Sequence, residues 1–275
     1  MEGSTNNTRL VGLIAGSKLL PIEFARIVKQ TSHLRIIAVG FEGETDPALE
    51  GLVDELHWIR VGQLGRLIKV FKQAGVRQCV MLGQVAPRNI FETRLDLRAL
   101  GVLLRLKEKN AHTIFGAVAE ELAKDGIELV DPRPWLKPLM PSVGFRMGPP
   151  IDSRVMSDLE FGYRIAKEIA RLDIGQTVVV KRGVVLAVEG FEGTDQCILR
   201  GGELAGKKGG AVAVKVAKEG HDMRFDIPCI GPETVLNCSR AGVSVLGFEG
   251  DKTLVLDRLE CENLCARFKV SILAI

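Results

Sequence analysis

The stretch Leu10-Val-Gly-Leu-Ile-Ala-Gly16-Ser17-Lys18-Leu-Leu-Pro21 decides the predicted fold. Its first six residues are apolar or small and predict a strand at Leu10–Ala15. Gly16 permits a tight turn, and Pro21 favours the first turn of a helix at Pro21–Lys29. A strand that runs through a glycine turn into a helix is typical of a parallel sheet with helices on its faces.

The same alternation of apolar runs and amphipathic stretches continues through the first half of the chain. Further strands are expected at Arg35–Val39, Leu56–Val61, Gln78–Leu82 and Glu128–Val130, and further helices at Leu49–Glu55, Leu64–Gln73, Asp96–Leu106 and Thr113–Asp125. We therefore predict an α/β protein whose N-terminal domain is a parallel sheet covered by helices on both faces. Ligands of such sheets bind at the carboxyl ends of the strands.

The second half predicts a C-terminal mixed α/β domain. A hairpin is expected first, because two apolar runs meet at Arg182-Gly183. The expected strands are Thr177–Lys181, Val184–Glu189, Ala211–Ala217, Val243–Phe248, Thr253–Leu256 and Val270–Leu273, and the expected helices are Met156–Arg171, Asp195–Leu204, Glu233–Ala241 and Glu260–Phe268.

A proline-rich linker joins the two predicted domains. Six of the 11 prolines fall between Pro132 and Pro150, and proline removes amide donors and fixes φ. We expect an extended, stiff linker at 132–151 between domains at 1–131 and 152–275. Its apolar side chains predict that it packs across a surface, of this chain or of a second subunit; they include Trp135, Leu136, Leu139, Met140 and Phe145.

Composition excludes several classes of function. The 275 residues carry a net charge of only +3 and 5% aromatic residues, so there is neither a basic stripe nor a set of stacking platforms for nucleic acid. The six cysteines form no Cys-x-x-Cys pair and are expected to be buried or idle thiols. No apolar run approaches the length of a membrane-spanning helix, and the run Leu10–Ala15 is too short and too weakly flanked to predict a signal peptide. A cytoplasmic protein is the expectation.

The glycine turn after the first strand is the first candidate site. The helix start that follows would suit a phosphate, with Gly12 and Gly16 shaping the approach and with Ser17 and Lys18 adding a hydroxyl and a cation. The turn lacks the second glycine of a dinucleotide fingerprint and the Gly-Lys-Ser/Thr of a P-loop. A purely structural turn and a phosphate-binding loop both remain open.

A second candidate is the acidic stretch Val188–Asp195. Glu189, Glu192 and Asp195 fall within seven residues, and carboxylates at this density repel one another unless a cation compensates them. Hard oxygen ligands suit Mg²⁺ or Mn²⁺. The alternative is that Thr194 and Asp195 only cap the helix that follows.

The third candidate alternates cations and anions at a strand exit. Lys215 precedes Asp222, Arg224 and Asp226, and these last three would point to one side of an extended chain. A structural ion pair around the arginine is the alternative. Two acidic clusters with Lys and Arg suit metal-assisted phosphoryl chemistry, in which the metal and the cations stabilise phosphate charge.

The motifs together resemble the UDP-2,3-diacylglucosamine pyrophosphatase family of lipid A biosynthesis, in its LpxI-type branch. The resemblance spans nearly the whole chain. It rests on Gly12-Leu-Ile-Ala-Gly16 with Leu20-Pro21, Leu172-Asp173-Ile-Gly-Gln176, Ala187-Val-Glu189-x-x-Glu192-Gly193-Thr194-Asp195, Lys215-Val-Ala-Lys218, Asp222-x-Arg224-x-Asp226-x-Pro228 and Ile230-Gly231-Pro232-x-Thr234.

The resemblance implies Mg²⁺-dependent hydrolysis of UDP-2,3-diacylglucosamine to lipid X and UMP, with water attacking the uridine-side phosphorus. It also implies a Rossmann-like N-terminal domain and a C-terminal α/β domain around a shared site, and a homodimer. The key aspartate is implied to lie in the Asp-x-Arg-x-Asp motif, where Asp226 is favoured over Asp222, with Arg224 beside them. The implied substrate-binding residues are Gly12, Gly16, Ser17, Lys18, Gln176, Thr194, Lys215 and Lys218, and the implied metal ligands are Glu189, Glu192, Asp195, Asp222 and Asp226.

Departures from the family pattern keep alternatives open. Lys18 stands where the family usually has glycine, Glu219-Gly-His221 replaces the usual Pro-Gly-Gln, and Asn110-Ala-His112 stands where many members carry Asp. A non-catalytic nucleotide- or lipid-binding homologue is one alternative, and a nucleotide-cofactor oxidoreductase is another. A diacylated substrate implies peripheral contact with the inner membrane. It also needs an apolar chamber. The apolar side chains of the linker, with Val143, would line part of this chamber, and the alternative is that they only dock the linker.

Overall fold

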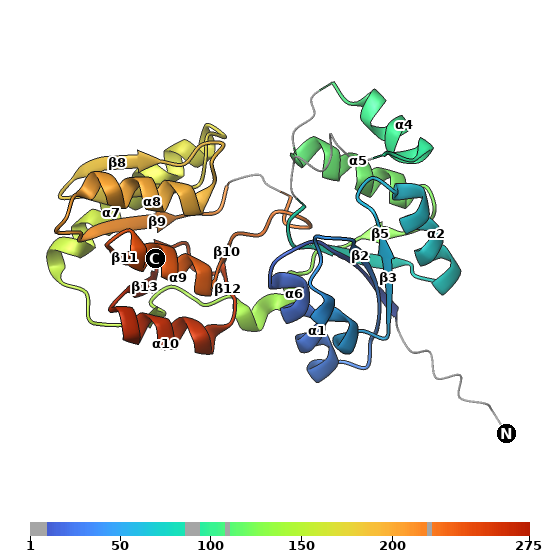
Figure 1. Ribbon diagram of the computed structural model, residues 1–275, viewed down its shortest axis with the longest axis horizontal. Helices are drawn as coiled ribbons and strands as arrows, with labels where there is room; N and C mark the ends of the chain where they lie inside the picture. The colour runs from blue at the N-terminus through green and yellow to red at the C-terminus, as the bar shows by residue number, and fades with distance from the viewer. Residues whose placement is uncertain (1–9, 86–93, 108–110, 219–221) are drawn as a thin grey trace. The chain divides into compact units, whose positions relative to one another are not determined.

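The structure is a computed structural model, and it describes residues 10–85, 94–107, 111–218 and 222–275. The chain folds into two compact units (Figure 1). Unit 1 comprises the residues up to Leu136 together with Asp222–Asp226, and unit 2 comprises Lys137–His221 and Ile227–Ile275. The short segment Asp222–Asp226 thus belongs with the N-terminal half. The predicted linear division into 1–131, 132–151 and 152–275 does not include this return of the chain.

Unit 1 is built on a five-stranded parallel sheet in the order β3-β2-β1-β4-β5. Its strands are β1 (Leu10–Ala15), β2 (Arg35–Phe41), β3 (Glu55–Ile59), β4 (Gln78–Leu82) and β5 (Glu128–Leu129), and its α-helices are α1 (Leu20–Thr31), α2 (Leu64–Ala74), α4 (Leu97–Arg105), α5 (Ala111–Ala123) and α6 (Arg133–Leu136). The order reverses at β1, as in Rossmann-like folds, and the predicted fold of this half is confirmed.

One predicted helix of unit 1 is wrong in kind. The stretch predicted as a helix at Leu49–Glu55 forms a 3₁₀ helix, η1, at Pro47–Leu52, and Glu55 already opens β3. The Asp46 side chain accepts the amide of Ala48 at the start of η1. The pairing of Glu55 with Ile37 in β2 fixes the strand, so sheet registration overrides local helix propensity there.

Unit 2 is built on a six-stranded mixed sheet in the order β6-β13-β11-β9-β7-β8. Its strands are β6 (Arg146–Met147), β7 (Thr177–Lys181), β8 (Val184–Val188), β9 (Ala211–Lys215), β11 (Val243–Phe248) and β13 (Ser271–Ala274), and β10 (Cys229–Ile230) pairs separately with β12 (Leu254–Val255). The helices are α7 (Ser153–Arg171), α8 (Thr194–Ala205), α9 (Pro232–Arg240) and α10 (Arg258–Phe268). The predicted mixed α/β domain is confirmed.

Alternate residues of the unit 2 sheet enter two apolar cores, one on each face. Val179 and Ala213 belong to the core that includes residues of α8, α9 and α10, whereas Val178 and Val214 belong to the core beneath α7. Helix α8 approaches β7 so closely that a Cβ atom on Gly201 would lie 2.5 Å from Val179 Cβ. Among the described residues, no helix is long and apolar enough to cross a membrane.

The segment predicted as an extended linker is partly helical, so that prediction is wrong. Its residues form α6 and a 3₁₀ turn, η2 (Lys137–Leu139), before reaching β6. The Pro132 carbonyl accepts the amides of Trp135 and Leu136, and Pro134 lies in the first turn, where the missing amide costs little. The prolines are therefore compatible with two short helices here, because Pro134 and Pro138 each lie in the first turn of one of them.

Candidate functional site

The polar residues predicted in unit 2 gather at one edge of its sheet. The carboxyl ends of β8, β9 and β11 lie at this edge with the start of β7, because Thr177 pairs with Lys215 and Phe248 also pairs with Lys215. Glu189 follows β8 directly and is buried. Topology thus brings together residues that lie far apart in the sequence, as expected for the carboxyl edge of a sheet.

Glu189 is held by its neighbours at this edge. One carboxylate oxygen accepts the Gln176 amide at 3.2 Å, and the other accepts the Thr194 hydroxyl at 3.3 Å. The N-cap of α8 is Gly193, without a side-chain capping bond. The alternative in which Thr194 and Asp195 cap this helix is therefore wrong; Thr194 faces Glu189 instead.

Three other predicted residues of this edge are engaged in polar contacts of their own. The Lys215 ammonium is buried and donates to the Cys229 carbonyl at 2.9 Å. Lys218 forms an ion pair with Asp173 at 2.7 Å, on the surface. Glu192 accepts the Arg200 guanidinium at 2.5 Å, and this hydrogen bond holds the pKa of Glu192 below its ordinary value.

Glu249 belongs to the same edge but is absent from the sequence-based prediction. It follows β11, is buried, and accepts the Ala217 amide at 2.9 Å and the Lys252 ammonium at 2.8 Å. Burial raises the pKa of Glu249, but these hydrogen bonds and the charges of Lys252 and Lys167 outweigh burial and leave the pKa lowered. A carboxylate directly after a buried strand was the signal in the sequence that could have identified it.

The Asp222–Asp226 segment forms a turn on unit 1. The Asp222 carbonyl accepts the amides of Phe225, at 3.2 Å, and Asp226, at 3.1 Å, so the extended arrangement predicted for Asp222, Arg224 and Asp226 is wrong. Arg224 donates from Nε to both carboxylate oxygens of Asp222, each at 2.9 Å. This hydrogen bonding to Asp222 raises the pKa of Arg224. The structural ion pair considered as the alternative for this arginine is therefore present with Asp222.

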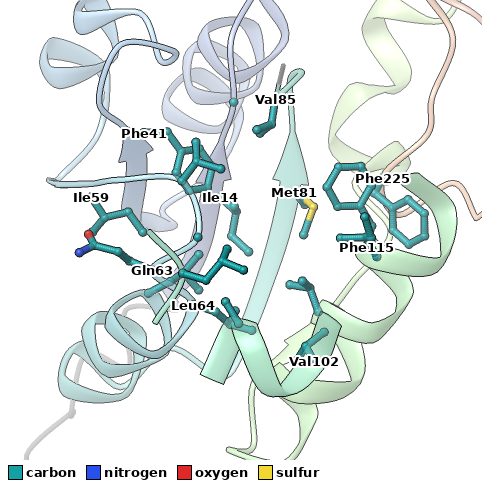
Figure 2. Close-up of a pocket in the computed structure, with 18 of the residues that line it drawn as sticks. Ile14, Phe41, Ile59, Gln63, Leu64, Met81, Val85, Val102, Phe115 and Phe225 are labelled. Atoms are coloured by element: carbon teal, nitrogen blue, oxygen red, sulfur yellow. The ribbon is translucent and has the colours of Figure 1, made fainter. Parts of the chain in front are cut away.

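Phe225, between these charged residues, enters an apolar pocket of unit 1. Its ring packs on Phe115 of α5 with the ring centroids 5.6 Å apart (Figure 2). The pocket runs from there past Met81 of β4 and Ile14 of β1 toward Ile59. The carboxyl end of the unit 1 sheet, where a polar ligand site was predicted, is therefore lined by hydrocarbon.

The hydrogen-bond donors of the glycine turn after β1 are engaged by backbone carbonyls of the same unit. The Gly16 amide donates to the Leu82 carbonyl at 2.8 Å, and both the amide and the hydroxyl of Ser17 donate to the Gln84 carbonyl, at 2.7 and 2.9 Å. These bonds favour a structural turn over a phosphate cradle. Lys18 follows with φ of +74°, a conformation that glycine would adopt more readily.

Gly12 lies in the interior of β1 rather than in the turn. A Cβ atom there would lie 2.8 Å from Cys79 Cβ, 2.9 Å from Val76 Cγ1 and 3.0 Å from Phe71 Cζ. The glycine therefore serves the packing of α2 and β4 against β1. Its predicted contact with substrate stays a prediction.

The predicted metal ligands divide between the units. Glu189, Glu192 and Asp195 belong to unit 2, and Asp222 and Asp226 belong to unit 1. In the part of the chain that the structure describes, no group of three or more His, Cys, Asp or Glu side chains could hold a metal ion. The metal stays a prediction.

Comparison with known proteins assigns the family. Residues 10–139 match the LpxI N-terminal domain, and residues 143–273 match the LpxI C-terminal domain. The chain is also 31% identical over 261 residues to the UDP-2,3-diacylglucosamine pyrophosphatase LpxI of Caulobacter vibrioides, with 91% of each chain covered. The chain belongs to the LpxI family. The boundary between the two LpxI domains falls just after the division between the units at Leu136.

A solved structure outside the LpxI family resembles the chain only weakly. The biotin carboxylase domain of Hydrogenobacter thermophilus 2-oxoglutarate carboxylase is 15% identical, with a TM-score of 0.26. The match covers 71% of this chain, which spans 41% of that one. The likeness is too low to carry an argument about fold or function.

Proposed function

We propose that the chain hydrolyses the pyrophosphate bond of UDP-2,3-diacylglucosamine to lipid X and UMP, a step of lipid A biosynthesis. The similarity to the Caulobacter vibrioides pyrophosphatase supports this reaction. The observation that carries the proposal is the Asp222–Asp226 turn, which combines two carboxylates and a guanidinium with a phenylalanine directed into an apolar pocket. That combination suits a substrate that is both a phosphate ester and a lipid.

In the proposed mechanism Asp226 acts as the general base. It takes a proton from water while the water oxygen forms a bond to the uridine-side phosphorus. The bond from that phosphorus to the bridging oxygen breaks, lipid X leaves with the bridging oxygen, and UMP retains the oxygen of the water. Arg224, held by Asp222, stabilises the negative charge that develops on the phosphate. Gln176, Thr194, Lys215 and Lys218 remain candidates for binding the substrate.

A Mg²⁺ ion fits this proposal as a partner of the substrate rather than as a resident ion. Mg²⁺ is usually held by one or two carboxylates together with substrate phosphates and water. Asp222 and Asp226 lie on one turn, but both carboxylate oxygens of Asp222 accept from Arg224, and the described residues provide no group of three ligands. Bound there, Mg²⁺ or Mn²⁺ would neutralise charge on the pyrophosphate.

Release of UMP from purified protein tests the function. We expect release in Mg²⁺ and its loss in EDTA. Asp226→Asn should lower kcat roughly 10²–10⁴-fold with little change in KM, because it removes the base and keeps the shape. Asp251→Asn, at an exposed aspartate of unit 2, is the matched control and should behave as wild type.

Four results would contradict parts of this proposal. An inactive protein that binds the substrate would be a non-catalytic homologue. Full activity in EDTA would exclude the metal. Equal losses of binding and turnover in Asp226→Asn would mean that Asp226 maintains the turn rather than acting as the base. Substrate-dependent reduction of a nicotinamide cofactor would favour an oxidoreductase, which the occupied donors of the Gly16–Ser17 turn disfavour.

Peripheral contact with the cytoplasmic face of the inner membrane is proposed for helix α4. Leu97, Leu100 and Leu104 recur at helical spacing on one face and are 90%, 42% and 74% exposed. A diacylated substrate resides in a bilayer, so an apolar helix beside the pocket would shorten its transfer. Sedimentation with lipid vesicles should fall in a Leu97→Ser, Leu104→Ser double variant and not in Leu259→Ser, whose leucine is similarly exposed on α10.

A homodimer is proposed from the family resemblance alone. Sedimentation velocity should give twice the mass of the 30.0 kDa chain. A monomer at all concentrations at which the enzyme is active would exclude it.

A further inference from the structure

The apolar pocket of unit 1 occupies the place where Rossmann-like domains bind ligands. It lies at the carboxyl ends of β1, β3 and β4 and is closed by residues of α2, α4 and α5 (Figure 2). Ile14, Leu67 and Val102 form part of its wall and are almost fully buried. The position is that of a ligand site, and the lining decides which ligand fits.

The lining disfavours a nucleotide. Among the described residues that line the pocket, Gln63 supplies the one polar side chain. A phosphate in this position would need the amides of the turn after β1, but the amides of Gly16 and Ser17 already donate to carbonyls of Leu82 and Gln84. A buried phosphate without donors is strongly unfavourable, whereas a hydrocarbon chain needs none.

The size of the pocket limits how much hydrocarbon it takes. Its volume is about 140 Å³. A protein cavity of about 150 Å³ lined by Leu, Ile and Phe holds one benzene molecule, so the pocket fits roughly six carbons. This is enough for the end of a single acyl chain and too little for two chains.

Phe225 connects the pocket to the charged turn. Its ring forms part of the wall, packed on Phe115, while the same turn carries Asp222, Arg224 and Asp226. We propose that the pocket binds the end of one acyl chain of the substrate. The chain contacts Phe225 in the pocket wall, and through this contact the length of the chain affects the Asp222–Asp226 turn. The acyl chain as ligand rests on the proposed function, but the preference for a hydrocarbon does not.

Pocket-filling variants test the assignment. Val102→Phe and the milder Ala99→Leu place extra carbons in the cavity from helix α4. Val184→Phe, at a position 58% exposed on β8 of unit 2, is the matched control. Binding is measured with cis-parinaric acid, a fluorescent fatty acid, and with lipid X as its competitor. Hydrolysis is measured with substrates whose acyl chains differ by two carbons.

We expect wild type and Val184→Phe to bind cis-parinaric acid. With the substrate whose chains are two carbons shorter, both should lose on the order of tenfold in kcat/KM, because each buried methylene changes the affinity roughly fourfold. Val102→Phe and Ala99→Leu should weaken probe binding at least tenfold and flatten this dependence on chain length. Thermal melting shows whether each variant folds; Ala99→Leu, which adds fewer atoms, carries the test if Val102→Phe does not fold.

The outcomes separate this inference from the proposed function. If folded Ala99→Leu and Val102→Phe bind the probe as wild type does and keep the dependence on chain length, the pocket does not hold the chain. Hydrolysis that requires Asp226 would still support the function in that case. Conversely, probe binding that is lost in the filled variants without any UMP release from wild type would support the pocket and overturn the hydrolysis.

Discussion

Gly12 in β1 allows close packing in unit 1 because it has no side chain. Gly12 leaves room for Phe71 of α2 and for Cys79 of β4, and a Cβ atom would lie within 3.0 Å of Phe71 Cζ. Gly12→Ala should therefore destabilise the protein by about 1–3 kcal/mol through overpacking, and kcat/KM should be unchanged while the protein remains folded. Urea unfolding and steady-state kinetics measure the two effects.

Gly51→Ala is the control for this variant, because nothing lies within 4 Å of a Cβ atom built there. A Gly12→Ala protein of unchanged stability and raised KM would instead support the predicted contact of Gly12 with the substrate.

At the scale of elements, Glu121 of α5 ties down helix α4. Its carboxylate accepts Lys124 at 2.6 Å, Arg98 at 2.9 Å and Arg105 at 3.3 Å. The hydrogen bonds from Lys124 and Arg98 lower the pKa of Glu121 to about 2 from 4.5, against an opposing effect of burial. Because α4 and α5 both line the apolar pocket, this cluster also maintains the pocket.

Glu121 should make stability depend on pH in acid. A lowered pKa in the folded state means that its contribution is complete above pH 4.5 and is lost as the pH falls toward about 2. We expect the urea midpoint of wild type to fall across this window and that of Glu121→Gln to fall less. Glu262→Gln, at an exposed glutamate of α10, should follow wild type. Parallel pH profiles of wild type and Glu121→Gln would contradict this expectation.

At the scale of the whole molecule, the chain returns to unit 1 at Asp222–Asp226, between the two segments that make up unit 2. Phe225 packs with the core of unit 1 although the rest of that unit ends at Leu136. Phe225→Ala should therefore destabilise unit 1, by about 1–3 kcal/mol because the ring is half-buried.

Hydrogen exchange measures this effect separately in each unit. Exchange should accelerate in β4 and α5 of unit 1 more than in β9 and β11 of unit 2 in Phe225→Ala. Phe191→Ala, at a fully exposed phenylalanine, is the control and should change neither unit. An increase confined to unit 2 would mean that the turn contributes nothing to unit 1.

Local sequence was enough to predict most elements of this protein. The strands at Gln78–Leu82 and Val243–Phe248 have the predicted bounds, because a short buried strand between turn residues is determined by its own apolar pattern. The proline-rich segment was mistaken for an extended linker, since the first turn of a helix tolerates proline. The family followed from motifs whose residues lie close together in the sequence.

The candidate site depended on contacts between distant residues, so the sequence predicted it only in part. It placed Glu189 and the Asp222–Asp226 motif among the candidate residues, but not Glu249, which accepts the amide of Ala217 beyond the end of the neighbouring strand β9. Nor did it predict that Phe225 joins the N-terminal unit and lines an apolar pocket there. The sequence by itself determined the elements and the family, because short-range patterns encode both. Only the tertiary structure decided which unit holds the charged turn and which side chains line the pocket, because both depend on packing between residues about a hundred positions apart.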